Sequence, residues 1–164
     1  MAQYLKESVR EAIVRGALLV LAERGYDSTT MAEIAEASSI SVGNIYRYFR
    51  SKTELYEAII TDDFVSEFEG LIRKRVRALS STRDIRELEA SAPYHVISEE
   101  LFRFSLSNRR KIVVLLGQSA GTRRECYREQ LVEILVGIAI EYARGLEGGY
   151  EGTEIDGFNI RLIY

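Results

Sequence analysis

The side chains best suited to chemistry are concentrated in residues 38–52, a segment without a single acidic residue. Its basic residues are Arg47, Arg50 and Lys52, and between them lie the hydrogen-bonding side chains of Ser41, Asn44, Tyr46 and Tyr48. Arginine can pair with guanine through two hydrogen bonds, asparagine can pair with adenine in the same way, and hydroxyl groups can reach phosphate oxygens. The segment therefore suits contact with a polyanion, and the alternative is a solvated turn with chance charge.

The charge balance of the whole chain limits what kind of polyanion contact this can be. Residues 1–52 hold seven basic and six acidic residues, and the rest of the 164-residue chain holds 15 basic and 19 acidic residues, for a net charge of −3. A protein that coats nucleic acid through bulk charge would be strongly basic. A localised contact through residues 38–52 stays consistent with this balance.

Cys126 and His95 are the only cysteine and the only histidine, and they suggest a second, less favoured chemistry. A Cys/His enzyme would need both groups within hydrogen-bond reach and a third, orienting group, and no nucleophile motif surrounds Cys126. A Cys/His zinc site would need more donors of these types than the chain has. We expect no enzymatic activity, no metal and no cofactor, and the lone cysteine fits a reducing cytoplasm.

Helices are expected to position the basic segment. Apolar residues recur at helical spacing from Val9 to Leu21, and Gly25 is the type of residue that ends a helix. Thr30–Glu33 has the sequence of a capping box, so a second helix is expected from about Met31 to Ala37. After a turn, Ser41 is expected to cap a third helix that reaches Phe49 and leaves most polar side chains outward. Two short helices joined by a tight turn predict a helix-turn-helix.

The remaining chain is also predicted to be helical. Capping-box sequences at Ser51–Glu54 and Thr122–Glu125 predict helices that run to Leu79 and to about Leu146. Other helices are expected over residues 84–106, with Pro93 as a kink or interruption, and over residues 109–119. No segment predicts a strand, and no apolar stretch is long enough for a bilayer. The predicted fold class is all-α, with no membrane partner.

Three linked motifs resemble the TetR family of bacterial transcriptional regulators. They are Thr29–Ala35, Ser41–Phe49 and Ser51–Leu55, and the resemblance spans residues 8–60. The family pattern usually has glycine in the turn where this chain has Ser39. The resemblance implies an amino-terminal DNA-binding domain over residues 1–52. It further implies that phosphates are contacted by Thr30, Tyr46, Tyr48 and Lys52. Gly43 is expected to lie close to the DNA. The residues expected to contact base edges are Ser41, Val42, Asn44 and Arg47.

The same resemblance implies a helical effector-binding and dimerisation domain over residues 53–164. The candidate ligand-binding residues are the aromatic side chains and the histidine of this region: Phe64, Phe68, Tyr94, His95, Phe102, Phe104 and Tyr127. The alternative for each is plain core packing. The implied function is that of a cytoplasmic repressor that a small molecule releases from a palindromic operator. A helical DNA-binding protein without an effector is the second interpretation, and a Cys126/His95 enzyme is the third.

The carboxy-terminal residues carry one further expectation. Apolar residues recur from Ile155 to Tyr164 at helical spacing, without a cap or a polar tail. Leaving such a face in water would cost ~25 cal/mol of free energy for each Å² of apolar area that stays unburied. We expect that a further helical segment follows Tyr164 in the complete protein, and that the protein is a homodimer.

Overall fold

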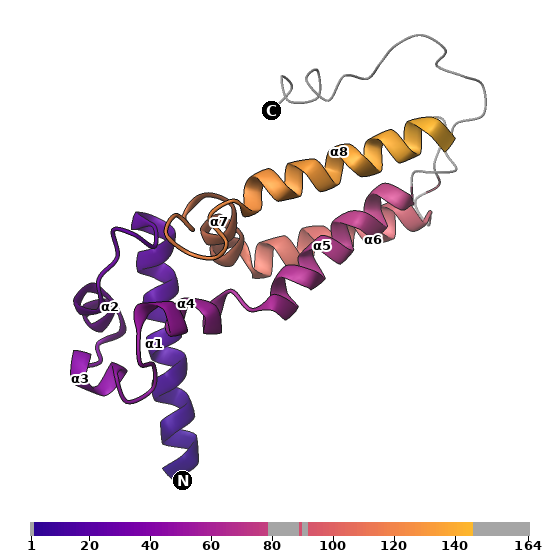
Figure 1. Cartoon of the computed structure of the whole chain (residues 1–164). Coiled ribbons are helices and arrows are strands. Elements are labelled where there is room, and N and C mark those ends of the chain that lie inside the picture. Colours follow the sequence, from indigo (N-terminus) through magenta and orange to yellow (C-terminus); the bar gives the residue numbers. More distant parts are fainter. Residues whose placement is uncertain (1, 79–88, 90–91, 146–164) are drawn as a thin grey trace. The chain divides into compact units, whose positions relative to one another are not determined.

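A computed structural model of the chain describes residues 2–78, 89 and 92–145 (Figure 1). It divides into two compact units, one made of Met1–Val65 and Ser107–Arg128 and the other of Ser66–Leu106 and Glu129–Tyr164. Every regular element in the described ranges is a helix, so the predicted all-α class is confirmed. None of the helices in these ranges is long and apolar enough to cross a membrane. The functional boundary between residues 52 and 53 stays a prediction.

The first unit is built around a long amino-terminal helix. Its helices are α1 (Ala2–Arg24), α2 (Met31–Ser38), α3 (Val42–Ile45), α4 (Lys52–Ile59) and α7 (Arg109–Gly117). Helix α1 contacts α2, α4 and α7, and α2 contacts α3. The core consists of apolar side chains that these helices turn toward one another, among them Ile13, Ala17, Leu21, Ile34, Ile45, Leu55 and Val114. A common core therefore fixes the short helices α2 and α3.

The ends of α1 and α2 follow the sequence signals closely. Helix α1 ends before Gly25, which has a φ of +79°, a conformation that favours glycine. The Thr30–Glu33 capping box is complete, because the Thr30 side chain accepts from the Glu33 N–H and the Glu33 carboxylate accepts from the Thr30 N–H. Helix α2 ends at Ser38, and the next residue, Ser39, has a φ of 57°, in the left-handed region. This conformation costs a non-glycine residue about 1–2 kcal/mol. The turn into α3 is thus formed without the usual glycine.

The prediction of one long helix from Thr53 to Leu79 is wrong. The helix is interrupted at Ile60, so the segment forms α4 and then α5 (Asp62–Arg77). Ile60 has a φ of −101° and a ψ of 71°, outside the helical region. Thr61 begins the new helix, since its side-chain oxygen accepts from the Phe64 N–H at 3.2 Å. Asp62 and Asp63 lie in the first turn of α5, where their negative charges interact favourably with the positive end of the helix dipole.

Three other predicted helix boundaries differ from the structure. The Thr122–Glu125 sequence forms a turn, because the Thr122 hydroxyl oxygen accepts from the Arg124 N–H at 3.0 Å and the Glu125 N–H donates to the Thr122 carbonyl at 3.2 Å; α8 (Tyr127–Gly145) begins only afterwards. Helix α6 (Pro93–Ser107) begins at Pro93, because the N–H that proline lacks would have no partner within the helix at its first position. Helix α3 ends at Ile45, four residues before Phe49. The expected helix over 155–164 lies outside the described residues, as do residues 84–88.

The second unit contains most of α5 together with α6 and most of α8. Phe68 of α5 and Phe104 of α6 are stacked, with ring centres 6.2 Å apart and planes 13° from parallel. Phe68, Leu71 and Ile138 are buried. Aromatic packing therefore joins α5 to α6 within this unit.

Candidate nucleic-acid interface

Helix α3 and the turn after it, residues 46–49, are held by apolar residues and present polar residues to solvent. Ile45 of α3 is 0% exposed and Phe49, at the end of the turn, is 2% exposed. The residues on the other side are exposed or, for Asn44 and Tyr48, half-buried: Ser41, Val42, Gly43, Asn44, Tyr46, Arg47 and Tyr48. The predicted burial of Ile45 and Phe49 is confirmed, although residues 46–49 do not continue the helix. The assignment of the exposed and half-buried residues to DNA stays a prediction.

The polar side chains of α3 and of the turn after it have no partner among the residues that the structure describes. Ser41 precedes α3 but its side chain makes no capping hydrogen bond. Across the described residues, the side chains of Asn44, Tyr46, Arg47 and Tyr48 make no hydrogen bond or ion pair. Arg47 and Tyr46 are exposed, Tyr46 to 49%. These groups keep all their donors and acceptors for an external ligand.

Thr30 and Lys52, two other predicted phosphate contacts, already have partners. The Thr30 hydroxyl is occupied by the capping box, where it donates to the Glu33 carboxylate at 2.8 Å. The Lys52 ammonium donates to the carbonyl oxygens of Tyr26 at 2.7 Å and Thr29 at 2.8 Å, with the Asp27 carbonyl at 3.4 Å. It also lies 4.2 Å from the centre of the Tyr26 ring. Lys52 therefore ties the start of α4 to the loop after α1, and a phosphate would have to compete for its three protons.

Replacing Lys52 with methionine is expected to destabilise the first unit. The substitution keeps an apolar stem but removes charge-assisted hydrogen bonds, each worth about 1.5–3 kcal/mol. Because Lys52 is half-buried, we expect a loss of about 1–3 kcal/mol in the free energy of unfolding, measured in urea. Arg50→Met, at an exposed neighbouring position, should leave stability unchanged. A Lys52→Met protein that is fully stable but binds DNA weakly would instead assign Lys52 to phosphate contact.

Arg10 is a basic residue of this region that the sequence patterns did not single out. It is exposed on α1, and its guanidinium carbon lies 5.4 Å from the centre of the Phe49 ring. The packing of α1 against the turn after α3 thus places a positive charge at Phe49, which lies between Arg47 and Arg50 in the sequence. No local motif could have identified Arg10, because its position depends on the contact between α1 and Phe49.

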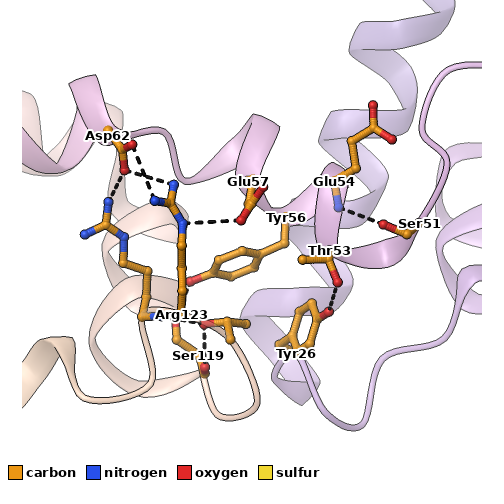
Figure 2. A network of polar contacts seen from close by, with 11 residues as sticks. Tyr26, Ser51, Thr53, Glu54, Tyr56, Glu57, Asp62, Ser119 and Arg123 are labelled. Carbon is orange, nitrogen blue, oxygen red and sulfur yellow. Dashed lines mark hydrogen bonds and ion pairs between the residues drawn. The ribbon is translucent and has the colours of Figure 1, made fainter.

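A network of polar contacts connects α4 to the segment that follows α7 (Figure 2). The Tyr56 and Ser119 hydroxyls lie 2.6 Å apart in a buried position, and the Ser119 hydroxyl donates to the Val114 carbonyl at 2.7 Å. Arg123 forms ion pairs with Glu57 at 3.3 Å and with Asp62 at 2.9 Å, and Figure 2 shows it between these two carboxylates. A movement of this segment would therefore displace residues of α4 that it contacts directly.

The same segment is bonded to the loop that follows α1. The Tyr26 N–H donates to the Gln118 carbonyl at 2.9 Å, and the Tyr26 hydroxyl lies 2.8 Å from the Thr53 hydroxyl of α4. The Tyr26 and Tyr56 rings are in edge-to-face contact at 5.3 Å. The end of α1, the start of α4 and the segment after α7 therefore form one bonded assembly behind the helix-turn-helix.

The predicted ligand-binding residues belong to both units. Phe64 and Tyr127 are buried in the first unit, whereas Phe68, Tyr94, His95, Phe102 and Phe104 belong to the second. Phe102 is 62% exposed and points to solvent rather than into a core. His95 makes edge-to-face contact with the neighbouring Tyr94 ring at 5.4 Å. The assignment of these residues to a ligand stays a prediction.

Comparison with known proteins places the amino-terminal residues among bacterial regulators. Residues 13–59 match the family model described as "Bacterial regulatory proteins, tetR family". The negative transcriptional regulator IcaR of the biofilm operon icaADBC in Staphylococcus aureus (strain Newman) is 35% identical over 49 residues, which cover 30% of this chain and 26% of that protein. The transcriptional repressor KstR2 of Mycolicibacterium smegmatis is 33% identical over 55 residues, which cover 34% of this chain and 27% of the repressor.

These matches concern the helix-turn-helix and its neighbours. The matched residues 13–59 include α2, α3, α4 and the second half of α1. The chain spans about a quarter of the length of the curated relatives it matches. A solved TetR family transcription regulator from Marinobacter aquaeolei VT8 aligns over 99% of this chain and 94% of its own, with 21% identity and a TM-score of 0.48.

Proposed function

Because residues 13–59 place this chain in the TetR family of bacterial regulatory proteins, we propose that it is a transcriptional regulator that binds specific double-stranded DNA through α3. The observation that carries the proposal is that α3 and the turn after it bury Ile45 and Phe49, whereas the side chains of Asn44, Tyr46, Arg47 and Tyr48 have no hydrogen-bond or ion-pair partner among the described residues. Arg47 reads a base edge, and the hydroxyls of Tyr46 and Tyr48 hold phosphates. Arg10 and Arg50 contribute general attraction to the phosphate backbone.

The proposal predicts a loss of DNA binding without a loss of stability when Gly43 is replaced by alanine. A Cβ atom at Gly43 would meet no protein atom within 4 Å, so the fold has room for it, and alanine favours a helix over glycine by about 1 kcal/mol. The added methyl group would occupy space between α3 and the DNA. We expect about tenfold weaker binding to the preferred DNA in fluorescence anisotropy, with an unchanged or higher melting temperature.

This prediction is wrong if Gly43→Ala and the parent protein bind the preferred DNA equally well, because α3 then does not lie against the duplex. Gly70→Ala serves as the control, because Gly70 lies in α5 and its Cβ position is equally open. Gly70→Ala should change neither DNA affinity nor sequence preference.

We further propose that the protein acts as a homodimeric repressor that a small molecule releases from its operator. A two-fold dimer places two α3 helices about one DNA turn apart, so the operator would be an inverted repeat. Release requires that the small molecule bind the DNA-free conformation more tightly. The contacts of Tyr56, Ser119 and Arg123 behind the helix-turn-helix support a route by which such a molecule could act on α4. Release would be seen as a lower DNA affinity in the presence of the small molecule.

A further inference from the structure

Arg75 is an unusual charged group within the second unit. It is half-buried on α5, and both of its hydrogen-bond partners lie on α6. Its Nε donates to the Ser98 hydroxyl at 3.1 Å, and one of its Nη atoms donates to the Tyr94 hydroxyl at 2.8 Å. The guanidinium carbon lies 5.1 Å from the centre of the Tyr94 ring. The positive charge is thus partly removed from water and held by two neutral groups.

The guanidinium keeps most of its capacity to bind an anion. It carries five N–H donors, of which these two contacts use two. Within the residues that the structure describes, Arg75 forms no ion pair with a carboxylate. A partly buried charge without a counter-charge is unfavourable, and an anion that supplied one would gain a charge-assisted, two-pronged contact.

Tyr94 can add a donor to the same anion. Its oxygen accepts the hydrogen bond from Arg75, so its own O–H proton is directed elsewhere. The nearby charge favours anions as well, because Arg73 and Lys74 precede Arg75 on α5. The exposed Glu99 of α6 is neutralised by Arg103 at 2.6 Å. An anion beside Arg75 would therefore meet donors and positive charge.

Buried apolar side chains continue from this polar group along the same helix faces. Phe68, Leu71 and Arg75 are spaced at i, i+3 and i+7, which places them on one face of α5. Phe68 stacks on Phe104 of α6, two turns away from Arg75. The facing sides of α5 and α6 are thus aromatic at one end and cationic at the other.

We propose that Arg75, Tyr94 and Ser98 bind the carboxylate of an organic acid whose remaining part is apolar and lies along the face toward Phe68. This inference deepens the proposed function and rests on it, since the acid would be the small molecule that regulates DNA binding. The structural alternative is that Arg75 only ties α5 to α6. The two accounts differ in what they predict for binding of a charged and an uncharged molecule of the same shape.

The test uses the full chain and isothermal titration calorimetry with sodium decanoate and decan-1-ol. Decanoate should bind at least about tenfold more tightly than decan-1-ol, because the alcohol lacks the charge that Arg75 recognises. Arg75→Gln should abolish this preference, while Arg110→Gln, at an exposed position of the first unit, should retain it. Tyr94→Phe keeps the ring and loses one donor, so it should weaken decanoate binding by about tenfold and leave decan-1-ol unaffected.

Two results would overturn the proposal: a parent protein that does not prefer decanoate, or an Arg75→Gln protein that retains the preference. If Arg75→Gln fails to fold, Tyr94→Phe alone decides, since unchanged decanoate binding in that variant also overturns the proposal. Adding decanoate to the DNA-binding assay tests the regulatory function separately. Arg75-dependent binding of decanoate supports the site even where DNA affinity is unchanged, and in that case only the regulatory role fails.

Discussion

Replacing Gly16 with alanine is expected to destabilise the first unit by about 1–3 kcal/mol, a typical cost of overpacking a core. Gly16 lies in the middle of α1, where alanine would ordinarily favour the helix by about 1 kcal/mol. A Cβ atom at this position would lie 2.7 Å from the Ser38 nitrogen and 2.8 Å from its Cα atom. Those are backbone atoms at the end of α2, so relief requires that α2 move away from α1.

Urea unfolding of the full chain measures this effect, with Gly70→Ala as the matched control. Gly70 is also inside a helix, but its Cβ position has no atom within 4 Å, so alanine there should be neutral or stabilising. Because α2 leads directly into the turn before α3, Gly16→Ala should also weaken DNA binding. If Gly16→Ala instead raised stability as Gly70→Ala does, the close contact between α1 and α2 would be wrong.

Replacing Arg47 with alanine is expected to cost about 1–3 kcal/mol of binding free energy on the preferred DNA and to relax the preference at one base pair. Arg47 is exposed beside α3, and its guanidinium has no partner within the described part of the protein. Truncation therefore removes donors that only the DNA would use. Stability should not change, because no internal contact is lost.

Arg50→Ala is the matched control for Arg47→Ala. Arg50 is also exposed, and its backbone N–H donates to the Glu54 carboxylate at 2.7 Å, a contact that alanine preserves. Loss of a phosphate contact should weaken all sequences alike and reduce the salt dependence of binding by about one unit of slope. If Arg47→Ala weakened preferred and random DNA equally, Arg47 would be a phosphate contact and not a base reader.

Short-range signals predicted the helix-turn-helix well because its elements are determined locally. The Thr30–Glu33 capping box, the glycine at the end of α1 and the apolar positions of α3 each act within one or two helical turns. The Thr122–Glu125 sequence has the same residue types but forms a turn, in which the Glu125 N–H donates to the Thr122 carbonyl and not to the Thr122 side chain. A capping-box sequence therefore does not by itself determine where a helix begins.

Contacts between distant residues could not be predicted from local patterns. Only the folded loop after α1 brings three carbonyl oxygens to the Lys52 ammonium, and contact of Lys52 with phosphate stays a prediction. The break between α4 and α5 has a local signal, since Thr61 and two aspartates are typical of a helix start. Arg75 also has a local signal, because it interrupts the apolar face that includes Phe68 and Leu71.

The measurement that tests the account most directly is selection of bound sequences from random double-stranded DNA, performed with the parent protein and with Arg47→Ala. The account predicts that the parent protein enriches an inverted repeat whose half-sites lie about one helical turn apart. The same selection with Arg47→Ala should enrich a motif that has lost its preference at one position in each half-site. Recovery of no enriched sequence by the parent protein, or of an identical motif by both proteins, would contradict the account.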